Sequence, residues 1–381
     1  MIALISVAGV LLLSARTHGF SPSVEVGVGR SQPPGKTQTA LHMATWSDSR
    51  AVKDYQEFLS SGKQEIERLP DGPSLIIQQK DGDTSMAEAL KTMGMGDDMI
   101  VTPDDALPES VGGQSEFPIY VTLPPYELED FIRNLSDAYK AKAEDFVFLS
   151  GGPKYGNIED VLKKFGYCRD SMTQVVISGM EIKPLGVEDI SCNIGVDGNG
   201  EDKLANVCTA CGKWNGAVAE RFEKSQIKCD LDFYREWRRK MWERNVYDAV
   251  FNLIGAVRSE PTTLGDVANY YHAEVADMVW EISSNLRGWK AITLLYGFED
   301  RMYGTGETSG KDEICHLDDK MFDFMYNSRV FTESKTLNSY LFYANEELGL
   351  LKDVTLPRKM DGSEEKRQIM RKGILRADGK I

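Results

Sequence analysis

The chain has 381 residues, of which 59 are acidic and 44 basic, so its formal net charge at pH 7 is −15. This excess of negative charge excludes a general nucleic-acid binder, because nucleic-acid phosphates are bound by basic surfaces. Six cysteines are too few for a disulfide scaffold in a chain of this length, which is long enough for two domains with a core each.

The N-terminus carries two successive patterns over residues 1–45. Residues 2–13 form an apolar run that is too short for a comfortable bilayer span and is typical of a signal-peptide core. Residues 20–45 are rich in Ser, Thr, Gly and Pro, with Glu25 as their only acid, which is the composition of a transit peptide. With Phe20 at the junction, the pair resembles the bipartite plastid-targeting presequence of diatoms and related algae. Secretion is the alternative, and no later run predicts a membrane span in the mature protein.

After an expected lead-in helix over 46–70, strand and helix patterns alternate as far as residue 199. Short apolar runs predict strands at 73–77, 98–101, 117–121, 145–149 and 174–177. Helical spacing between them predicts helices at 86–93, 128–139 and 158–165. Repeated strand, helix, strand order indicates a parallel sheet with helices on its faces, which is a Rossmann-like domain over 71–199.

From residue 200 to 355 the predicted elements are helical. Expected helices cover 204–224, 232–257 and 263–296, with further pieces to about 350, and 356–381 is read as a flexible tail. The predicted fold class is therefore α/β, with a Rossmann-like parallel-sheet domain followed by an all-helical C-terminal domain. The boundary is placed in the Gly- and Asp-rich stretch 186–202.

The predicted helix over 232–257 carries a polar row. Arg244, Asp248 and Asn252 are four residues apart, so they stack along one side of the helix. Two interpretations are open. Either Arg244 and Asp248 form an ion pair that fixes helix packing, or the row lines a cleft and does chemistry.

Trp242, Arg244, Asp248, Asn252 and the following residues 253–256 resemble the ketopantoate reductase pattern W-x-K-L-x-x-N-x-x-x-N-P-L-T-A. The resemblance extends in layout over 71–350, to the wider group with a 6-phosphogluconate dehydrogenase-like C-terminal domain. It implies an NAD(P)-dependent oxidoreductase acting on a small carboxylate, with Arg244 where the family has its catalytic lysine and Asp248 where it has a substrate-binding asparagine. Arginine stays protonated, so it orients an anion but is a poor proton donor.

The expected nucleotide-binding turn follows the first strand. Register places Gly82, Thr84 and Ala87 at the three positions of the G-x-G-x-x-G/A fingerprint. Thr84 brings a β-branched side chain to the position where the pyrophosphate approaches the backbone. Asp81 and Asp83 bring carboxylates that would repel it. An ordinary polar turn is the alternative interpretation.

Two further segments belong to the expected cofactor site. Asp104, after the second strand, is interpreted either as a ligand for the ribose of NAD or as a turn former. Gly151 and Gly152 align with the family's Gln-Asn-Gly segment, whose asparagine this chain lacks. Binding of NAD(P) is therefore expected to be weak or lost.

Cys208 and Cys211 form a C-x-x-C pair near the start of the helix expected over 204–224 and are interpreted as a redox pair or as core cysteines. Lys213 is interpreted as an anion ligand or as a solvated lysine.

Two functions follow. The first is a divergent ketopantoate reductase-like enzyme of the plastid, in which Arg244 clamps a small carboxylate. The second is a non-catalytic binding or regulatory protein with the same fold. A homodimer is kept as a hypothesis.

We expect the native mature chain to begin first at Phe20, after cleavage of the bond from Gly19, and then at a second site before about residue 46. N-terminal sequencing of protein purified from its source checks this. Retention of Met1 or Ala3 would remove the targeting argument.

Overall fold

The computed structural model describes residues 56–57, 60–61, 66, 68–82, 84–149, 158–167, 171–177, 180–182, 190–192, 208–225, 227–308, 310–317 and 319–348. All of these residues belong to one compact unit. The expected presequence, the tail over 356–381 and the domain boundary near 199 lie outside them, so these three expectations stay predictions. Within the described part of the chain, no helix is both long enough and apolar enough to cross a membrane.

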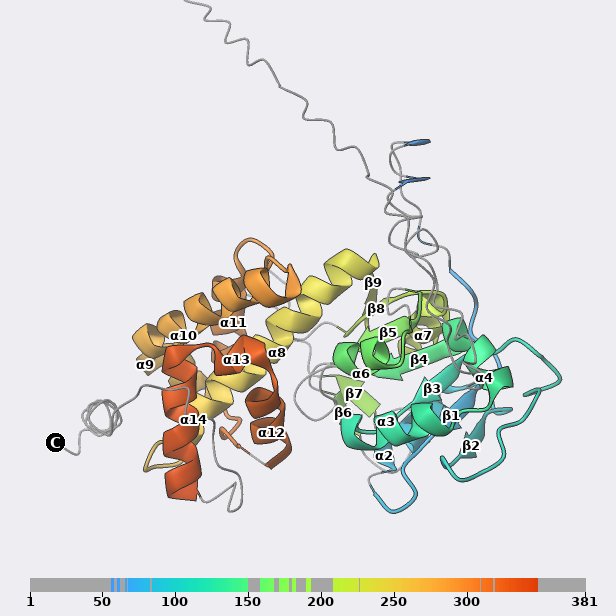
Figure 1. The fold of residues 1–381 in the computed structure, drawn as a ribbon, viewed down its shortest axis with the longest axis horizontal. Helices are drawn as coiled ribbons and strands as arrows, with labels where there is room; N and C mark the ends of the chain where they lie inside the picture. Colours follow the sequence, from blue (N-terminus) through green and yellow to red (C-terminus); the bar gives the residue numbers. More distant parts are fainter. Residues whose placement is uncertain are drawn as a thin grey trace, which may run out of the picture. The chain divides into compact units, whose positions relative to one another are not determined.

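A seven-stranded sheet has the order β2-β1-β3-β4-β5-β8-β9 (Figure 1). The first five strands in this order are parallel, whereas β8 is antiparallel to β5 and parallel to β9. Strands covered on both faces are continuous apolar runs, and β1, β3 and β4 are buried at every position. The strands are β1 Leu75–Ile77, β2 Met99–Val101, β3 Ile119–Val121, β4 Phe146–Leu149, β5 Thr173–Val176, β8 Cys208–Cys211 and β9 Cys229–Leu231. A separate hairpin pairs β6 Met180–Ile182 with β7 Ile190–Cys192.

Helices cover both faces of the sheet. Side chains of α2 and α7 pack with Ile76 on one face, and side chains of α3, α4 and α6 pack with Leu75 and Ile77 on the other. The helices are α2 Ser85–Met93, α3 Pro125–Asn134, α4 Asp137–Ala141, α6 Glu159–Lys164 and α7 Asn215–Glu223, with a short 3-10 turn η2 Ala143–Asp145. The predicted Rossmann-like arrangement of parallel strands and covering helices is confirmed.

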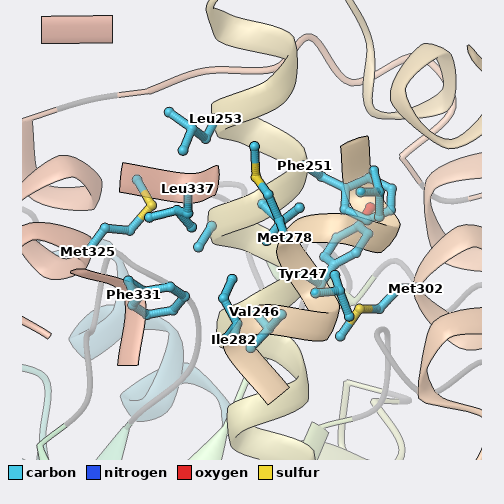
Figure 2. Packing of buried hydrophobic residues seen from close by; sticks show 14 of the residues in the cluster. Val246, Tyr247, Phe251, Leu253, Met278, Ile282, Met302, Met325, Phe331 and Leu337 are labelled. Carbon is cyan, nitrogen blue, oxygen red and sulfur yellow. The ribbon is translucent and has the colours of Figure 1, made fainter. Parts of the chain in front are cut away.

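A helical region follows β9. Its elements are α8 Tyr234–Ala256, α9 Leu264–Tyr270, α10 His272–Asn285, the π-helical turn η5 Leu286–Lys290, α11 Phe298–Glu307, α12 Asp319–Asn327, α13 Arg329–Thr332 and α14 Lys335–Leu348. Residues 245–255 of α8 are all buried. Figure 2 shows Val246, Tyr247, Phe251 and Leu253 of α8 among side chains of its neighbours, such as Met278. A helix that is buried on every side is the centre of a core, as the sequence pattern indicates.

Three helix predictions were wrong in detail. Residues 208–211 form a strand instead of the start of a helix, and α7 begins only after Gly212. Gly212 has φ +96°, and a Cβ there would lie 2.4 Å from the Met172 carbonyl oxygen, so this tight turn requires glycine. The helix expected over 263–296 is split into α9, α10 and η5 and ends at Ala291, which has φ +54°. The helix expected over 128–139 is split by an N-cap at Ser136.

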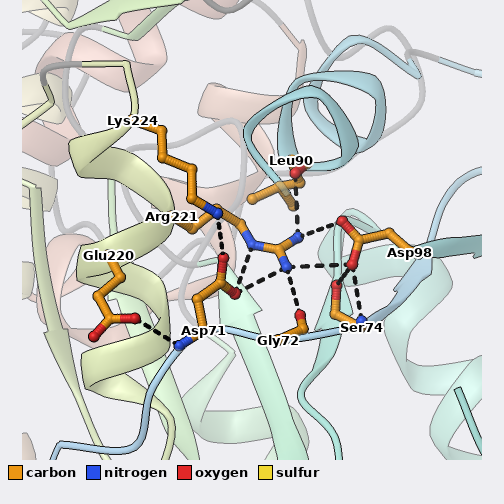
Figure 3. A network of polar contacts seen from close by, with 8 residues as sticks. All are labelled: Asp71, Gly72, Ser74, Leu90, Asp98, Glu220, Arg221 and Lys224. Carbon is orange, nitrogen blue, oxygen red and sulfur yellow. Dashed lines mark hydrogen bonds and ion pairs between the residues drawn. The ribbon is translucent and has the colours of Figure 1, made fainter. Parts of the chain in front are cut away.

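A fully buried arginine organises the amino ends of the first two strands (Figure 3). Nε and Nη2 of Arg221 donate to Asp71 Oδ1 at 3.2 and 3.0 Å, and Nη1 donates to Asp98 Oδ2 at 3.0 Å. The guanidinium also donates to the carbonyl oxygens of Leu90 and Gly72, each at 3.1 Å. One side chain of α7 therefore holds α2 and the segments that precede β1 and β2.

The carboxylates around Arg221 have further partners. Asp98 accepts hydrogen bonds from the backbone N–H and hydroxyl of Ser74 at 2.8 and 2.6 Å, and Lys224 Nζ lies 2.8 Å from Asp71 Oδ2. The Tyr120 ring centroid lies 4.7 Å from the guanidinium carbon, and burial raises the pKa of this tyrosine. A buried charge is tolerated only with such complete pairing.

We expect Arg221→Met to lower the free energy of unfolding by about 3 kcal/mol or more, because it leaves two buried carboxylates without their cation. Lys224→Met, which removes a cation that is 36% exposed, should cost less than about 1 kcal/mol. Urea unfolding of the two variants measures the difference. Equal losses in both would contradict the central role of Arg221.

Candidate functional site

The order of strands creates a switch point between β1 and β3. The chain runs from β1 to β2 on one side and then returns to β3 on the other side of β1. In doubly wound sheets, ligands bind at the carboxyl ends of the strands at such a point. The candidate nucleotide site is therefore formed by the turns that follow β1, β2 and β3.

The turns after β1 and β3 are joined by hydrogen bonds. The backbone N–H and the hydroxyl of Thr122 both donate to the Ile77 carbonyl oxygen at 3.0 Å. Gln79 Nε2 donates to Glu127 Oε1 at 2.5 Å, which links the β1 turn to the first turn of α3. The polar side chains at this edge thus bond to one another within the protein.

Of the predicted fingerprint residues, Gly82 and Thr84 lie between β1 and α2, and Ala87 lies in the first turn of α2. A Cβ at Gly82 would meet only the end of the Gln79 side chain, so the backbone does not demand glycine there. Thr84 is the N-cap of α2, and its hydroxyl donates to Glu88 Oε1 at 3.1 Å. Ala87 is fully buried against the sheet, which suits the third position of the fingerprint. Asp83 lies outside the described residues.

Acidic side chains gather at the carboxyl edge of the sheet. Asp104 Oδ2 lies 2.7 Å from Lys80 Nζ across the two turns, and both side chains are largely exposed. Asp104 lies within the turn over 102–105, as one interpretation predicted, and the side chain of the next residue closes that turn. Asp105 accepts hydrogen bonds from the backbone N–H and hydroxyl of Thr102 at 2.7 and 2.9 Å, and these bonds hold the pKa of its carboxyl below the ordinary value. Gly151 and Gly152 lie outside the described residues.

These residues fit a dinucleotide only in part. Ala87 allows the close helix packing, but Thr84 places a side chain where the phosphates would approach. Glu88 lies in the first turn of α2, where it occupies the positive end of the helix dipole. Weak or lost pyrophosphate binding at this turn stays a prediction.

The polar row of α8 forms the ion pair that the first interpretation predicts. Arg244 Nε lies 2.9 Å from Asp248 Oδ2, with the two side chains 18% and 8% exposed. Asn252 donates to the Asp248 carbonyl oxygen at 2.9 Å and accepts from the backbone N–H of His316 at 3.0 Å. Burial raises the pKa of Asp248, and the Arg244 charge offsets only part of that rise. Whether Arg244, Asp248 and Asn252 act in catalysis stays a prediction.

Described contacts join α8 to the sheet region two turns before Arg244. Trp237 Nε1 donates to the Thr209 carbonyl oxygen of β8 at 3.2 Å. Arg238 pairs through Nε and Nη2 with the fully buried Glu159 of α6, and its Nη1 donates to the Lys290 carbonyl oxygen at 3.0 Å. These bonds fix the register of α8 against β8 and α6.

The interpretation of Lys213 as a solvated lysine was wrong, and its role as a ligand for a bound anion stays a prediction. Its Nζ lies 2.5 Å from Glu116 Oε1 and 2.6 Å from Asp145 Oδ1, and the side chain is 22% exposed. Trp214 Nε1 donates to the same Asp145 oxygen at 3.1 Å. Glu116 and Asp145 precede β3 and β4, so Lys213 ties amino ends of strands together. Sequence reasoning had no signal for these partners, because they are distant along the chain.

The redox interpretation of Cys208 and Cys211 was wrong. Both are buried on β8 and are not joined by a disulfide. Because they are three residues apart on a strand, their side chains point to opposite faces. Cys208 packs with the core of α2 and α7, and Cys211 packs with the core of α8. They are core cysteines, which is the alternative that the sequence left open.

No protein-family model and no curated protein matches the chain. Among solved structures, it is similar to 2-dehydropantoate 2-reductase from Methylococcus capsulatus, with 14% identity, 80% of this chain and 97% of that chain covered, and a TM-score of 0.40. It is similar to a dimeric ketopantoate reductase from Staphylococcus aureus at 10% identity, with coverages of 81% and 99% and a TM-score of 0.40. A D-mandelate dehydrogenase in complex with NADH gives 12% identity, coverages of 81% and 100% and a TM-score of 0.40. Likenesses at these values do not assign a family.

We expect Arg244→Met to lower the free energy of unfolding by about 3 kcal/mol near pH 8, because it leaves the Asp248 carboxylate buried without its cation. Arg235→Met, at an exposed position of the same helix, is the control. Arg244→Met/Asp248→Leu should recover most of the loss.

The loss in Arg244→Met should also shrink between about pH 8 and about pH 5. The folded-state pKa of Asp248 is raised, so protonation favours the folded state at low pH, and this benefit disappears as the pH rises through that pKa. Urea unfolding at both pH values measures the effect. A pH-independent loss would mean that Asp248 is not stranded.

Proposed function

We propose that the protein is a divergent oxidoreductase-like protein of the ketopantoate reductase-like kind, which holds a small carboxylate through Arg244. The observation that carries this proposal is the combination of a doubly wound sheet, with its switch point at β1 and β3, and a buried helix α8 with a cation in its middle. The Arg244 side chain is 18% exposed, so it is not wholly sealed in the core.

The Arg244–Asp248 pair suggests how the residues would respond to a bound carboxylate. A ligand carboxylate would compete with Asp248 for the guanidinium. As Arg244 turned to the ligand, its lowering effect on the pKa of Asp248 would weaken. Asp248 would then take up a proton, which it could donate to a ligand oxygen. Arg244 would bind and orient, and Asp248 would hold the proton.

Nicotinamide binding is proposed to be weak. Thr84 and the acidic side chains at the carboxyl edge oppose a pyrophosphate, which leaves a second function open. In that second function the protein binds a small carboxylate without reducing it, as a regulatory or binding protein. The position of Thr84 in the β1–α2 turn, which opposes a pyrophosphate, favours this second function.

We expect the unmodified protein to bind a small 2-oxo acid detectably and to bind NADH and NADPH weakly, with dissociation constants above about 100 µM. Arg244→Met/Asp248→Leu, which keeps the helix free of a stranded charge, should bind no 2-oxo acid. Isothermal titration calorimetry measures both ligands. Unchanged 2-oxo acid binding by this double variant would refute the role of Arg244.

Nucleotide binding is tested with the double variant Asp83→Ala/Thr84→Gly. This variant should bind NADPH more strongly if the turn otherwise accepts a dinucleotide. Asp130→Ala removes an exposed carboxylate from α3 and is the charge-matched control for the Asp83 change. Micromolar NADPH binding by the unmodified protein would return the full reductase assignment. Carboxylate binding without nucleotide binding in any variant would favour the non-catalytic function.

A further inference from the structure

Tyr247 of α8 has a buried hydroxyl group that no described residue satisfies. The residue is 2% exposed, and its hydroxyl oxygen has no hydrogen-bond partner among the residues that the structure describes. A buried polar group without a partner destabilises the fold, so its presence in a protein calls for an explanation. An oxygen atom of a bound ligand is an acceptor that would satisfy this hydroxyl.

The hydroxyl belongs to a side chain that lies against the cation of the proposed carboxylate site. The Arg244 guanidinium carbon lies 5.2 Å from the centroid of the Tyr247 ring. Burial raises the pKa of Tyr247, while the Arg244 charge lowers it in part and the Asp248 charge adds to the rise. The group is therefore a neutral O–H at neutral pH, and a neutral phenol donates a hydrogen bond to an acceptor oxygen.

Two close neighbours of Tyr247 make no hydrogen bond with its hydroxyl. The Phe251 ring packs on the tyrosine ring, with the ring centroids 4.5 Å apart. Gly310 approaches so closely that a Cβ there would lie 3.1 Å from the hydroxyl oxygen, and both backbone groups of Gly310 are bonded to other residues. Of the two charged groups of α8 beside the tyrosine, Arg244 is the more exposed, at 18% against 8% for Asp248. We therefore expect a ligand to reach the hydroxyl from the Arg244 side.

We propose that Tyr247 is a specificity-determining residue of the carboxylate site, and that its hydroxyl donates a hydrogen bond to the 2-oxo oxygen of an acid held by Arg244. This inference rests on the proposed function. A 2-oxo acid carries its oxo oxygen on the carbon next to the carboxylate, so an acid bound at the guanidinium brings that oxygen towards the adjacent tyrosine. An acid without the oxo group leaves the buried hydroxyl without an acceptor, and such a mismatch lowers affinity.

Two small acids separate the contribution of Tyr247 from that of Arg244. Pyruvate and propionate share a carbon skeleton and a carboxylate, and pyruvate alone has the 2-oxo oxygen. Arg244 holds the carboxylate of both, whereas Tyr247 favours pyruvate. The unmodified protein should therefore bind pyruvate about tenfold more tightly than propionate.

Tyr247→Phe removes only the hydroxyl group. It should lower pyruvate affinity about tenfold and leave propionate affinity unchanged, so that the two affinities become equal. The melting temperature should not fall, because the hydroxyl makes no hydrogen bond with the described residues that the change would break. Isothermal titration calorimetry with both acids and thermal unfolding measure these effects.

Tyr120→Phe is the matched control for this change. Tyr120 is also buried, and its hydroxyl also lacks a partner within the described part of the chain, but its ring lies against Arg221 in the sheet region. This variant should keep the pyruvate preference of the unmodified protein.

A pyruvate preference that persists in Tyr247→Phe overturns the inference, as does an unmodified protein that binds both acids equally. An equal loss of both acids together with a lower melting temperature also overturns it, because that result shows a packing role. If Arg244→Met/Asp248→Leu then binds neither acid, the proposed function stands and only the role of Tyr247 fails. An unmodified protein that binds neither acid instead overturns the proposed function, and this inference with it.

Discussion

The pairing of one buried guanidinium with two buried carboxylates is the constraint on which the sheet region depends. Arg221 has no exposed surface and meets Asp71 and Asp98, which come from segments more than a hundred residues earlier in the chain. Removing three charges from water is costly, and only an arrangement that pairs all of them recovers that cost. The α7 helix can therefore cover the sheet only in the register that puts Arg221 between the two acids. This requirement selects one arrangement of β1, β2, α2 and α7.

Helix α8 has the same role for the helical region. Its second half is buried on all sides and packs against the other helices, while Trp237 and Arg238 in its first half bond to β8 and α6. Arg244 lies between these two parts, on a helix that is anchored on both sides of it. In the proposed function, a carboxylate ligand would compete with Asp248 for the Arg244 guanidinium, whose Nε lies 2.9 Å from Asp248 Oδ2.

The sequence allowed the parallel sheet and the long helix to be predicted because their burial produces continuous apolar runs. It could not separate strand from helix at Cys208–Cys211, since a short buried run of small residues suits either, and the pairing with β5 decides. It also could not assign polar partners. Lys213 meets Asp145, 68 residues away, and Asp105 instead of Asp104 closes the turn after β2. The local spacing of apolar residues predicts which segments are buried, whereas the partners in ion pairs depend on the assembled fold.

The two edges of the sheet use acidic residues in opposite ways. At the amino edge, Asp71 and Asp98 are neutralised by a buried cation, so their charge contributes to stability and is withdrawn from solvent. At the carboxyl edge, the Asp104 carboxylate pairs with the exposed Lys80. Because water screens the charge of this exposed lysine, negative charge remains where a phosphate would approach. The carboxylate side of the proposed function has a cation in Arg244, while the cation on the nucleotide side, Lys80, is largely exposed and paired with Asp104. In the proposed function, weak nucleotide affinity therefore does not by itself require loss of carboxylate binding.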